Sequence, residues 1–116
     1  PLVLGIDLEE RCAGLAPTIR GSDGPDVLTG TNKPDVIMGL GGADVIRGGN
    51  DDDVICGGAG DDTLRGENGG DTLLGGFGDD VLSGGNGDDV LIGGPGDDTL
   101  AGGGGVNQLE QEGPES

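Results

Sequence analysis

A large aliphatic residue recurs at every ninth position of this chain, from Leu28 to Leu109. Starting at Gly21, the sequence divides into ten nonapeptides without an insertion or deletion. Position 1 is glycine in all ten and position 8 is leucine or isoleucine in all ten, whereas position 6 is aspartate in nine and Asn107 in the tenth. A period this strict predicts a repeat architecture, in which each unit buries its apolar side chain by stacking on its neighbours.

Each nonapeptide combines a glycine-rich turn with a short β-prone segment. Glycines at positions 1, 2 and 4 permit a tight turn, and the valines, threonines and isoleucines of positions 7 and 8 favour a strand. Side chains alternate along a strand, so position 8 should point inward and positions 7 and 9 outward. One turn and one strand reverse the chain once, so two nonapeptides should complete one coil, which predicts an all-β solenoid with two parallel sheets.

This arrangement assigns the aliphatic residues to two stacks, one in each sheet. Residues 18–20 are in phase with positions 7 to 9, so Ile19 should lie beneath Ile37. The first stack contains Leu28, Ile46, Leu64, Leu82 and Leu100, and the second contains Ile37, Ile55, Leu73, Leu91 and Leu109.

Composition narrows the classes of function. The 116 residues include 23 acidic and 5 basic side chains, for a net charge of -18. Such a surface does not suit nucleic acid or an anionic membrane, and no apolar stretch is long enough for a membrane span. The chain has no histidine, which removes the Ser-His-Asp triad, the Cys-His pair and the HExxH zinc site. We therefore expect no enzyme and no catalytic residues, and a multivalent cation as the natural partner.

The position-6 aspartates should form two columns, because successive coils lie roughly 4.8 Å apart. Like charges at that spacing repel by about 1 kcal/mol in water and more in a less polar medium. Ca²⁺ fits this setting, since it takes carboxylate and carbonyl oxygens in flexible geometry, whereas Mg²⁺ demands a tighter octahedron. The candidate metal ligands are Asp26, Asp44, Asp62, Asp80 and Asp98 on one edge, and Asp35, Asp53, Asp71 and Asp89 on the other.

The pattern GGxGxDxUx, in which U is a large aliphatic residue, resembles the hemolysin-type, or RTX, calcium-binding repeat over residues 18–110. The resemblance implies a right-handed parallel β-roll with Ca²⁺ between turns of adjacent coils, and about seven sites. It also implies a secreted protein that folds on meeting external calcium, and the chain resembles the small secreted actinobacterial members of the family. The backbone carbonyls implied as further ligands are those of Gly57, Ala59, Gly75, Gly76, Phe77, Gly78, Gly94 and Gly96.

Two turns depart from the pattern, and one set of acidic residues has a simpler explanation. The turn 30–35 carries Thr31 and Lys33 in place of glycine, so a site between Asp35 and Asp53 should be the weakest. Asn107 is neutral, so a site there should be weak or absent. The aspartates at position 5 are expected to be a solvated face.

The two cysteines, Cys12 and Cys56, leave two alternatives open. Position 9 faces outward, so Cys56 is either a free thiol or the partner of Cys12 in a disulfide between the N-terminal segment and the flank of the roll. A disulfide would suit a secreted protein. We expect residues 1–17 to be a cap segment, residues 18–110 the roll and residues 111–116 a disordered acidic tail.

The predicted function is calcium binding that drives folding outside the cell. Each repeat buries only one aliphatic side chain, which stabilises by roughly 1.5–3 kcal/mol, whereas ordering nine residues costs on the order of 13 kcal/mol. We therefore expect a chain that is largely disordered without Ca²⁺, and a monomer or part of a larger secreted chain. The alternatives are the repeat region of a secreted enzyme, toxin or adhesin, an ice- or surface-binding solenoid, and a disordered glycine-rich linker.

Overall fold

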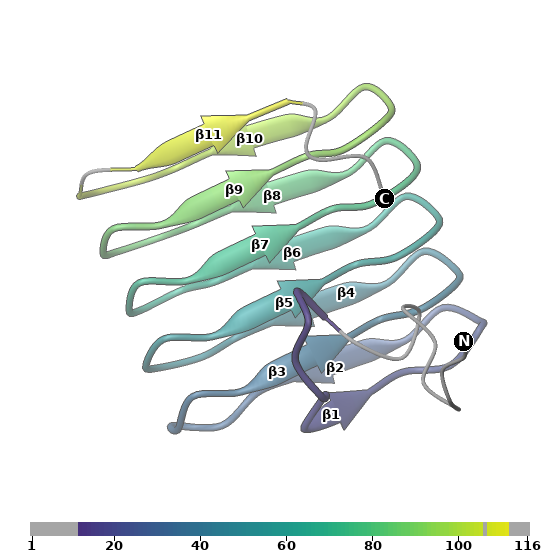
Figure 1. Cartoon of the computed structure of the whole chain (residues 1–116), viewed down its shortest axis with the longest axis horizontal. Coiled ribbons are helices and arrows are strands. Elements are labelled where there is room, and N and C mark those ends of the chain that lie inside the picture. Colours follow the sequence, from purple (N-terminus) through teal and green to yellow (C-terminus); the bar gives the residue numbers. More distant parts are fainter. Residues whose placement is uncertain (1–11, 106, 112–116) are drawn as a thin grey trace.

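The computed structural model describes residues 12–105 and 107–111, and these residues form short β-strands joined by turns (Figure 1). Each strand from β2 onward covers positions 7 to 9 of one nonapeptide, as the repeat predicts. The strands are β1 (Ile19–Arg20), β2 (Val27–Thr29), β3 (Val36–Met38), β4 (Val45–Arg47), β5 (Val54–Cys56), β6 (Thr63–Arg65), β7 (Thr72–Leu74), β8 (Val81–Ser83), β9 (Val90–Ile92), β10 (Thr99–Ala101) and β11 (Gln108–Glu110).

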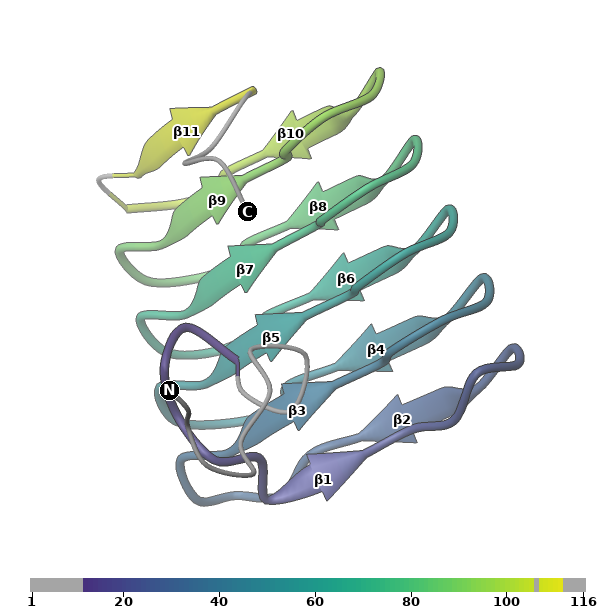
Figure 2. The same ribbon diagram turned by 45° about the vertical axis from the view of Figure 1, so that its right-hand side comes forward.

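The strands form two parallel sheets that face each other along the whole roll (Figure 2). The six-stranded sheet has the order β1-β3-β5-β7-β9-β11, and the five-stranded sheet has the order β10-β8-β6-β4-β2. The odd-numbered strands run in front and the fainter even-numbered strands return behind them, so the coils rise with a right-handed turn (Figure 1). The predicted β-roll with two nonapeptides per coil is confirmed.

The register between neighbouring strands is 18 residues throughout. Ile37 pairs with Ile55 in the six-stranded sheet, and Ile46 pairs with Leu64 in the other. Ile19 pairs with Ile37, as predicted. Every position-8 side chain therefore stacks on the position-8 side chain one coil away.

The core is the space between the two sheets, and the position-8 side chains fill it. Those of the inner coils are completely buried, while Ile19, Leu28 and Leu100 pack against them from the two ends. Leu109, in the last described strand, remains 47% exposed. The fully buried members are Ile37, Ile46, Ile55, Leu64, Leu73, Leu82 and Leu91.

A disulfide joins Cys12 to Cys56, with their Cα atoms 5.7 Å apart. Cys56 ends β5 and lies on the outer face of the six-stranded sheet, so residues 12–17 lead from the flank of the roll to β1 (Figure 2). This finding settles the two alternatives for the cysteines in favour of the disulfide. Residues 1–11 of the expected cap and residues 112–116 of the expected tail lie outside the described residues. None of the described residues belongs to a helix of the length and apolarity that crossing a bilayer takes.

Candidate metal centre

The position-6 aspartates form a hydrogen-bonded ladder along each edge of the roll. From Asp26 to Asp80, the backbone N–H of each of these aspartates donates to Oδ1 of the aspartate 18 residues later, as from Asp44 to Asp62 at 2.8 Å and from Asp62 to Asp80 at 2.8 Å. On the opposite edge Asp53 donates to Asp71 in the same way, again at 2.8 Å. One carboxylate oxygen is thereby fixed between coils, and the orientation of each side chain is fixed with it.

The second carboxylate oxygen, Oδ2, has no partner in the inner coils. Six aspartates are only 1% exposed, and none of their Oδ2 atoms has a hydrogen-bond partner among the described residues. A buried polar atom without a partner costs about 1–3 kcal/mol, and more when it is charged. These oxygens therefore need a positive group that the described protein does not provide. The six aspartates are Asp44, Asp53, Asp62, Asp71, Asp80 and Asp89.

Asn107 identifies the groups that surround Oδ2, because an amide nitrogen takes the place of that oxygen in its turn. Its Oδ1 accepts the backbone N–H of Asp89 at 2.8 Å, as an aspartate would. Its Nδ2 donates to the carbonyl oxygens of Gly103, Gly104 and Gly105 at 3.2, 3.2 and 3.4 Å. The carbonyls of positions 2, 3 and 4 thus converge on the site where the other turns place an anionic oxygen.

Eight turns share the backbone conformation of the Asn107 turn, and we call them open turns. They are positions 1 to 6 of the last eight nonapeptides, from the one that begins at Gly39 to the one that begins at Gly102. In all eight, positions 2 and 4 have positive φ, even where the residue is not glycine, as at Leu40 (φ 73°) and Glu67 (φ 75°). Such residues rarely adopt this region, at a cost of roughly 1–2 kcal/mol. The conformation that accompanies the converging carbonyls of Gly103, Gly104 and Gly105 is therefore shared by all eight turns.

Glycine at position 1 keeps the site open. A Cβ added to Gly39 would lie 2.6 Å from Oδ2 of Asp44 and 2.8 Å from the carbonyl oxygen of Gly57. A Cβ added to Gly57 would lie 2.6 Å from Oδ2 of Asp62 and 2.8 Å from the carbonyl oxygen of Gly75. A side chain would fill a space that lies between a carboxylate of one coil and a carbonyl of the next.

The implied carbonyl ligands fall on these same turn positions. Gly57 and Gly75 supply the position-1 carbonyls that face the aspartate of the preceding coil. The others occupy positions 2 to 4 of open turns, which are the positions that surround Nδ2 of Asn107. These are Ala59, Gly76, Phe77, Gly78, Gly94 and Gly96.

The first two turns, residues 21–26 and 30–35, differ, and we call them hydroxyl turns. Their positions 2 and 4 lack the positive φ of the open turns. The backbone N–H of Ser22 donates to Oδ2 of Asp26 at 2.7 Å, and that of Thr31 donates to Oδ2 of Asp35 at 2.6 Å. The Thr31 hydroxyl also donates to the Asp35 carboxylate and accepts the N–H of Lys33 at 3.1 Å. Sequence reasoning missed these contacts, although the hydroxyl residue in place of the position-2 glycine was the available signal.

Burial dominates the electrostatics of the ladders. It raises the pKa of Asp62 to about 8, those of Asp71 and Asp80 to about 7, and that of Asp53 to about 6, from a usual value of 3.8. The hydrogen bond from the preceding aspartate's backbone opposes the shift, while neighbouring carboxylates add to it. Removal of the carboxylates from water is thus the main reason that a cation would be favoured here.

The donor set is one that suits calcium. Within residues 12–105 and 107–111, no three His, Cys, Asp or Glu side chains cluster as a metal site built from side chains alone. Any ion at these turns would instead take carboxylate oxygen together with several backbone carbonyls. Hard oxygen donors in this number fit Ca²⁺, with six to eight ligands, whereas Zn²⁺ prefers nitrogen and sulfur.

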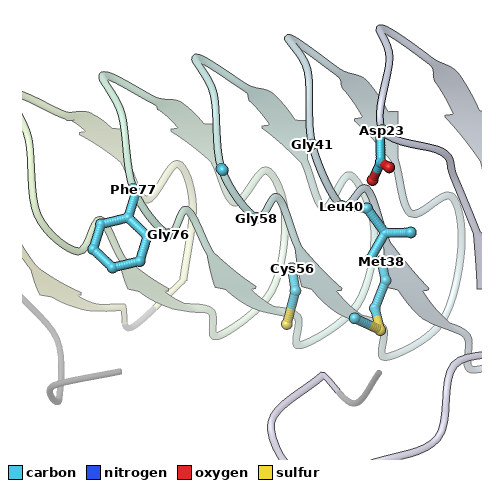
Figure 3. A pocket seen from close by; sticks show the side chains of 9 residues that line it. Asp23, Met38, Leu40, Gly41, Cys56, Gly58, Gly76 and Phe77 are labelled. Carbon is cyan, nitrogen blue, oxygen red and sulfur yellow. The ribbon is translucent and has the colours of Figure 1, made fainter. Parts of the chain in front are cut away.

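An apolar groove lies beside the disulfide (Figure 3). Its volume is about 410 Å³, and its walls include Met38, Leu40, Cys56 and Phe77. Among the described residues that line it, Asp23 is the only titratable one. None of the position-6 aspartates lines it, but Ala59, Gly76 and Phe77 do, so the groove adjoins the open turns on one edge of the roll.

Comparison with known proteins agrees with this geometry. The family model described as RTX calcium-binding nonapeptide repeat (4 copies) matches residues 18–32, 29–64, 48–82, 65–100 and 74–109. A search of curated proteins finds no significant match.

Proposed function

Because the chain belongs to the RTX calcium-binding nonapeptide repeat family, whose repeats bind calcium, we propose that Ca²⁺ held along the two aspartate ladders drives the folding of this roll outside the cell. Calcium would supply the positive charge that the buried Oδ2 atoms need. The protein's own part is to orient the carboxylates through the Oδ1 hydrogen bonds and to present the turn carbonyls.

One observation carries the proposal: six buried carboxylate oxygens have no partner among the described residues. At about 1–3 kcal/mol each, they would together cost about 6–18 kcal/mol. The net stability of a whole domain is typically about 5–15 kcal/mol. A roll without metal would therefore lose most or all of its stability at neutral pH, so binding and folding should be coupled.

We place the protein in an oxidising, calcium-rich compartment, as a secreted monomer or as part of a larger secreted chain. The disulfide between Cys12 and Cys56 supports this location, because such bonds persist outside the cytosol. The family is a calcium-binding repeat and not a catalytic family. The proposed role is therefore structural, namely a stabilising domain whose fold depends on calcium.

The test is a Ca²⁺ titration of the disulfide-intact chain, followed by far-UV circular dichroism, with Mg²⁺ as the control ion. We expect a cooperative change from coil to β-structure with Ca²⁺ and none with Mg²⁺. Full β-structure in metal-free buffer at neutral pH, or no response to Ca²⁺, would contradict the proposal.

A matched pair of variants links the transition to the ladder. Asp62 is buried and its neighbour Asp61 is exposed, although both accept a backbone N–H through Oδ1, from Asp44 and Asp79 respectively. Asp62→Asn keeps the Oδ1 acceptor and removes one anionic Oδ2, so it should lower the number of bound ions by one. Asp61→Asn should leave that number unchanged. Equal losses in the two variants would mean that general acidity, and not the ladder, binds the metal.

A further inference from the structure

We propose that the roll's own hydrogen-bond donors close both ends of the calcium array, so that the six aspartates with unpartnered Oδ2 atoms bind metal and Asp26, Asp35 and Asp98 do not. This inference rests on the proposed calcium binding and goes further, because it assigns the boundaries of the array to named residues. Six ions would replace the estimate of about seven that follows from pairing every neighbouring aspartate.

Hydrogen-bond donors close the N-terminal end. In the two hydroxyl turns, the backbone N–H groups of Ser22 and Thr31 point at Oδ2 of Asp26 and Asp35, at 2.7 and 2.6 Å. A donor hydrogen occupies the side of the oxygen that a cation would occupy, and its partial positive charge repels one. These two carboxylates have all their oxygens satisfied inside the turn, so they have no need of an ion.

An amide closes the last aspartate of the ladder. Nε2 of Gln111 donates to Oδ2 of Asp98 at 2.8 Å and to the carbonyl oxygen of Gly96 at 3.2 Å. The nitrogen thus joins a position-6 carboxylate to a position-4 carbonyl of the same turn, which are the groups that a calcium ion would join. In the following turn, Nδ2 of Asn107 binds the carbonyls in the same manner.

The two ends are closed by different means. The hydroxyl turns have a different backbone conformation, and both position 2 and position 4 would have to move to positive φ before their carbonyls matched those of the open turns. The turn of Asp98 already has the open conformation, with φ 85° at Gly94 and 115° at Gly96. Gln111 occupies the carboxylate and a carbonyl of this turn, so loss of that single amide should expose one additional site.

The experiment counts bound calcium per folded chain by native mass spectrometry and equilibrium dialysis, with circular dichroism as the check on folding. Gln111→Ala should bind one ion more than the wild-type chain. Gln108→Ala is the matched control, because Gln108 is an exposed glutamine of β11 three residues away. Adding Asp98→Asn to Gln111→Ala should remove the additional ion.

The N-terminal boundary is tested on one edge, where Asp35 and Asp53 are stacked. Asp53→Asn should lose one ion, and Asp35→Asn should lose none. The inference is overturned if Gln111→Ala binds the same number as wild type, or if Asp35→Asn loses an ion. A wild-type chain that neither binds Ca²⁺ nor folds with it would instead overturn the proposed function, so the two failures are distinguishable.

Discussion

Acid should stabilise the roll when calcium is absent, because protons can neutralise the buried aspartates in place of the ions. The pKa is about 6 for Asp53, about 7 for Asp71 and Asp80, and about 8 for Asp62, against 3.8 in a solvated chain. The roll therefore binds more protons than the unfolded chain across this range. Its proton-linked stability is complete below about pH 3.8 and is lost as the pH rises through 6 to 8.

The magnitude follows from the number of protons. Near pH 5, these four carboxyl groups are protonated in the metal-free roll and largely ionised in the unfolded chain. Each proton of difference changes the free energy of unfolding by about 1.4 kcal/mol per pH unit, so four give up to about 5 kcal/mol per pH unit. A change of one pH unit should thus be comparable with the stability of a small domain.

The assay follows β-structure by circular dichroism in calcium-stripped buffer between pH 8 and pH 5, above the isoelectric point near 4.1. An osmolyte such as trimethylamine oxide brings the metal-free chain into its folding transition. The folded fraction should increase as the pH falls. Asp62→Asn should lower the slope of the free energy of unfolding against pH by the equivalent of about one proton, and it should stabilise the metal-free roll at pH 8. Asp61→Asn should change neither the slope nor the stability. A folded fraction that is flat or that decreases on acidification would refute the reasoning.

Three further predictions concern the calcium-loaded roll. Leu64→Ala should cost about 2–5 kcal/mol in denaturant unfolding, because this side chain is completely buried, whereas Val27→Ala, at a side chain 76% exposed, should cost about 0.5 kcal/mol or less. Gly57→Ala should remove the ion beside Asp62, since the new Cβ meets Oδ2 of Asp62 and a backbone carbonyl. Gly24→Ala is the control, because the nearest atom to its new Cβ is 3.9 Å away. An equal loss of calcium in both variants would mean that the position-1 glycine does not keep the site open. Reduction of the disulfide, which closes a loop of 44 residues, should cost up to about 4 kcal/mol and raise the calcium concentration at the folding midpoint; an unchanged midpoint would mean that the link does not stabilise the roll.

The repeat was sufficient to predict most of the fold. A period without insertions determines which residues share a stack, so the pairing of Ile19 with Ile37 followed from counting alone. The same counting predicted that the position-6 aspartates would align, and the buried ladders show that they do. It also predicted that Cys56 lies on an outer face, although composition could not decide whether its thiol was free.

The division of the aspartates into two classes was beyond the sequence. A period gives the residue at each turn position, but it does not give the direction of each peptide plane, and that direction decides whether an N–H or a carbonyl faces Oδ2. Leu40 and Glu67 have the glycine-like conformation, whereas Gly24 does not, so residue identity alone would have misled. Gln111 approaches Asp98 from outside the repeat, where no periodic pattern applies.

The 18-residue register has a consequence for how such a chain can change its length. Adding or deleting a whole coil returns every later strand to its own sheet, with each aspartate still beneath the next. A change of nine residues instead moves all later strands to the opposite sheet. Leu74 would then leave the face that it shares with Cys56, its partner in the register, and join the outer face of the other sheet, where Arg65 pairs with Ser83. The roll can therefore grow or shrink by whole coils while both of its faces keep their chemistry, and a single repeat is too small a step.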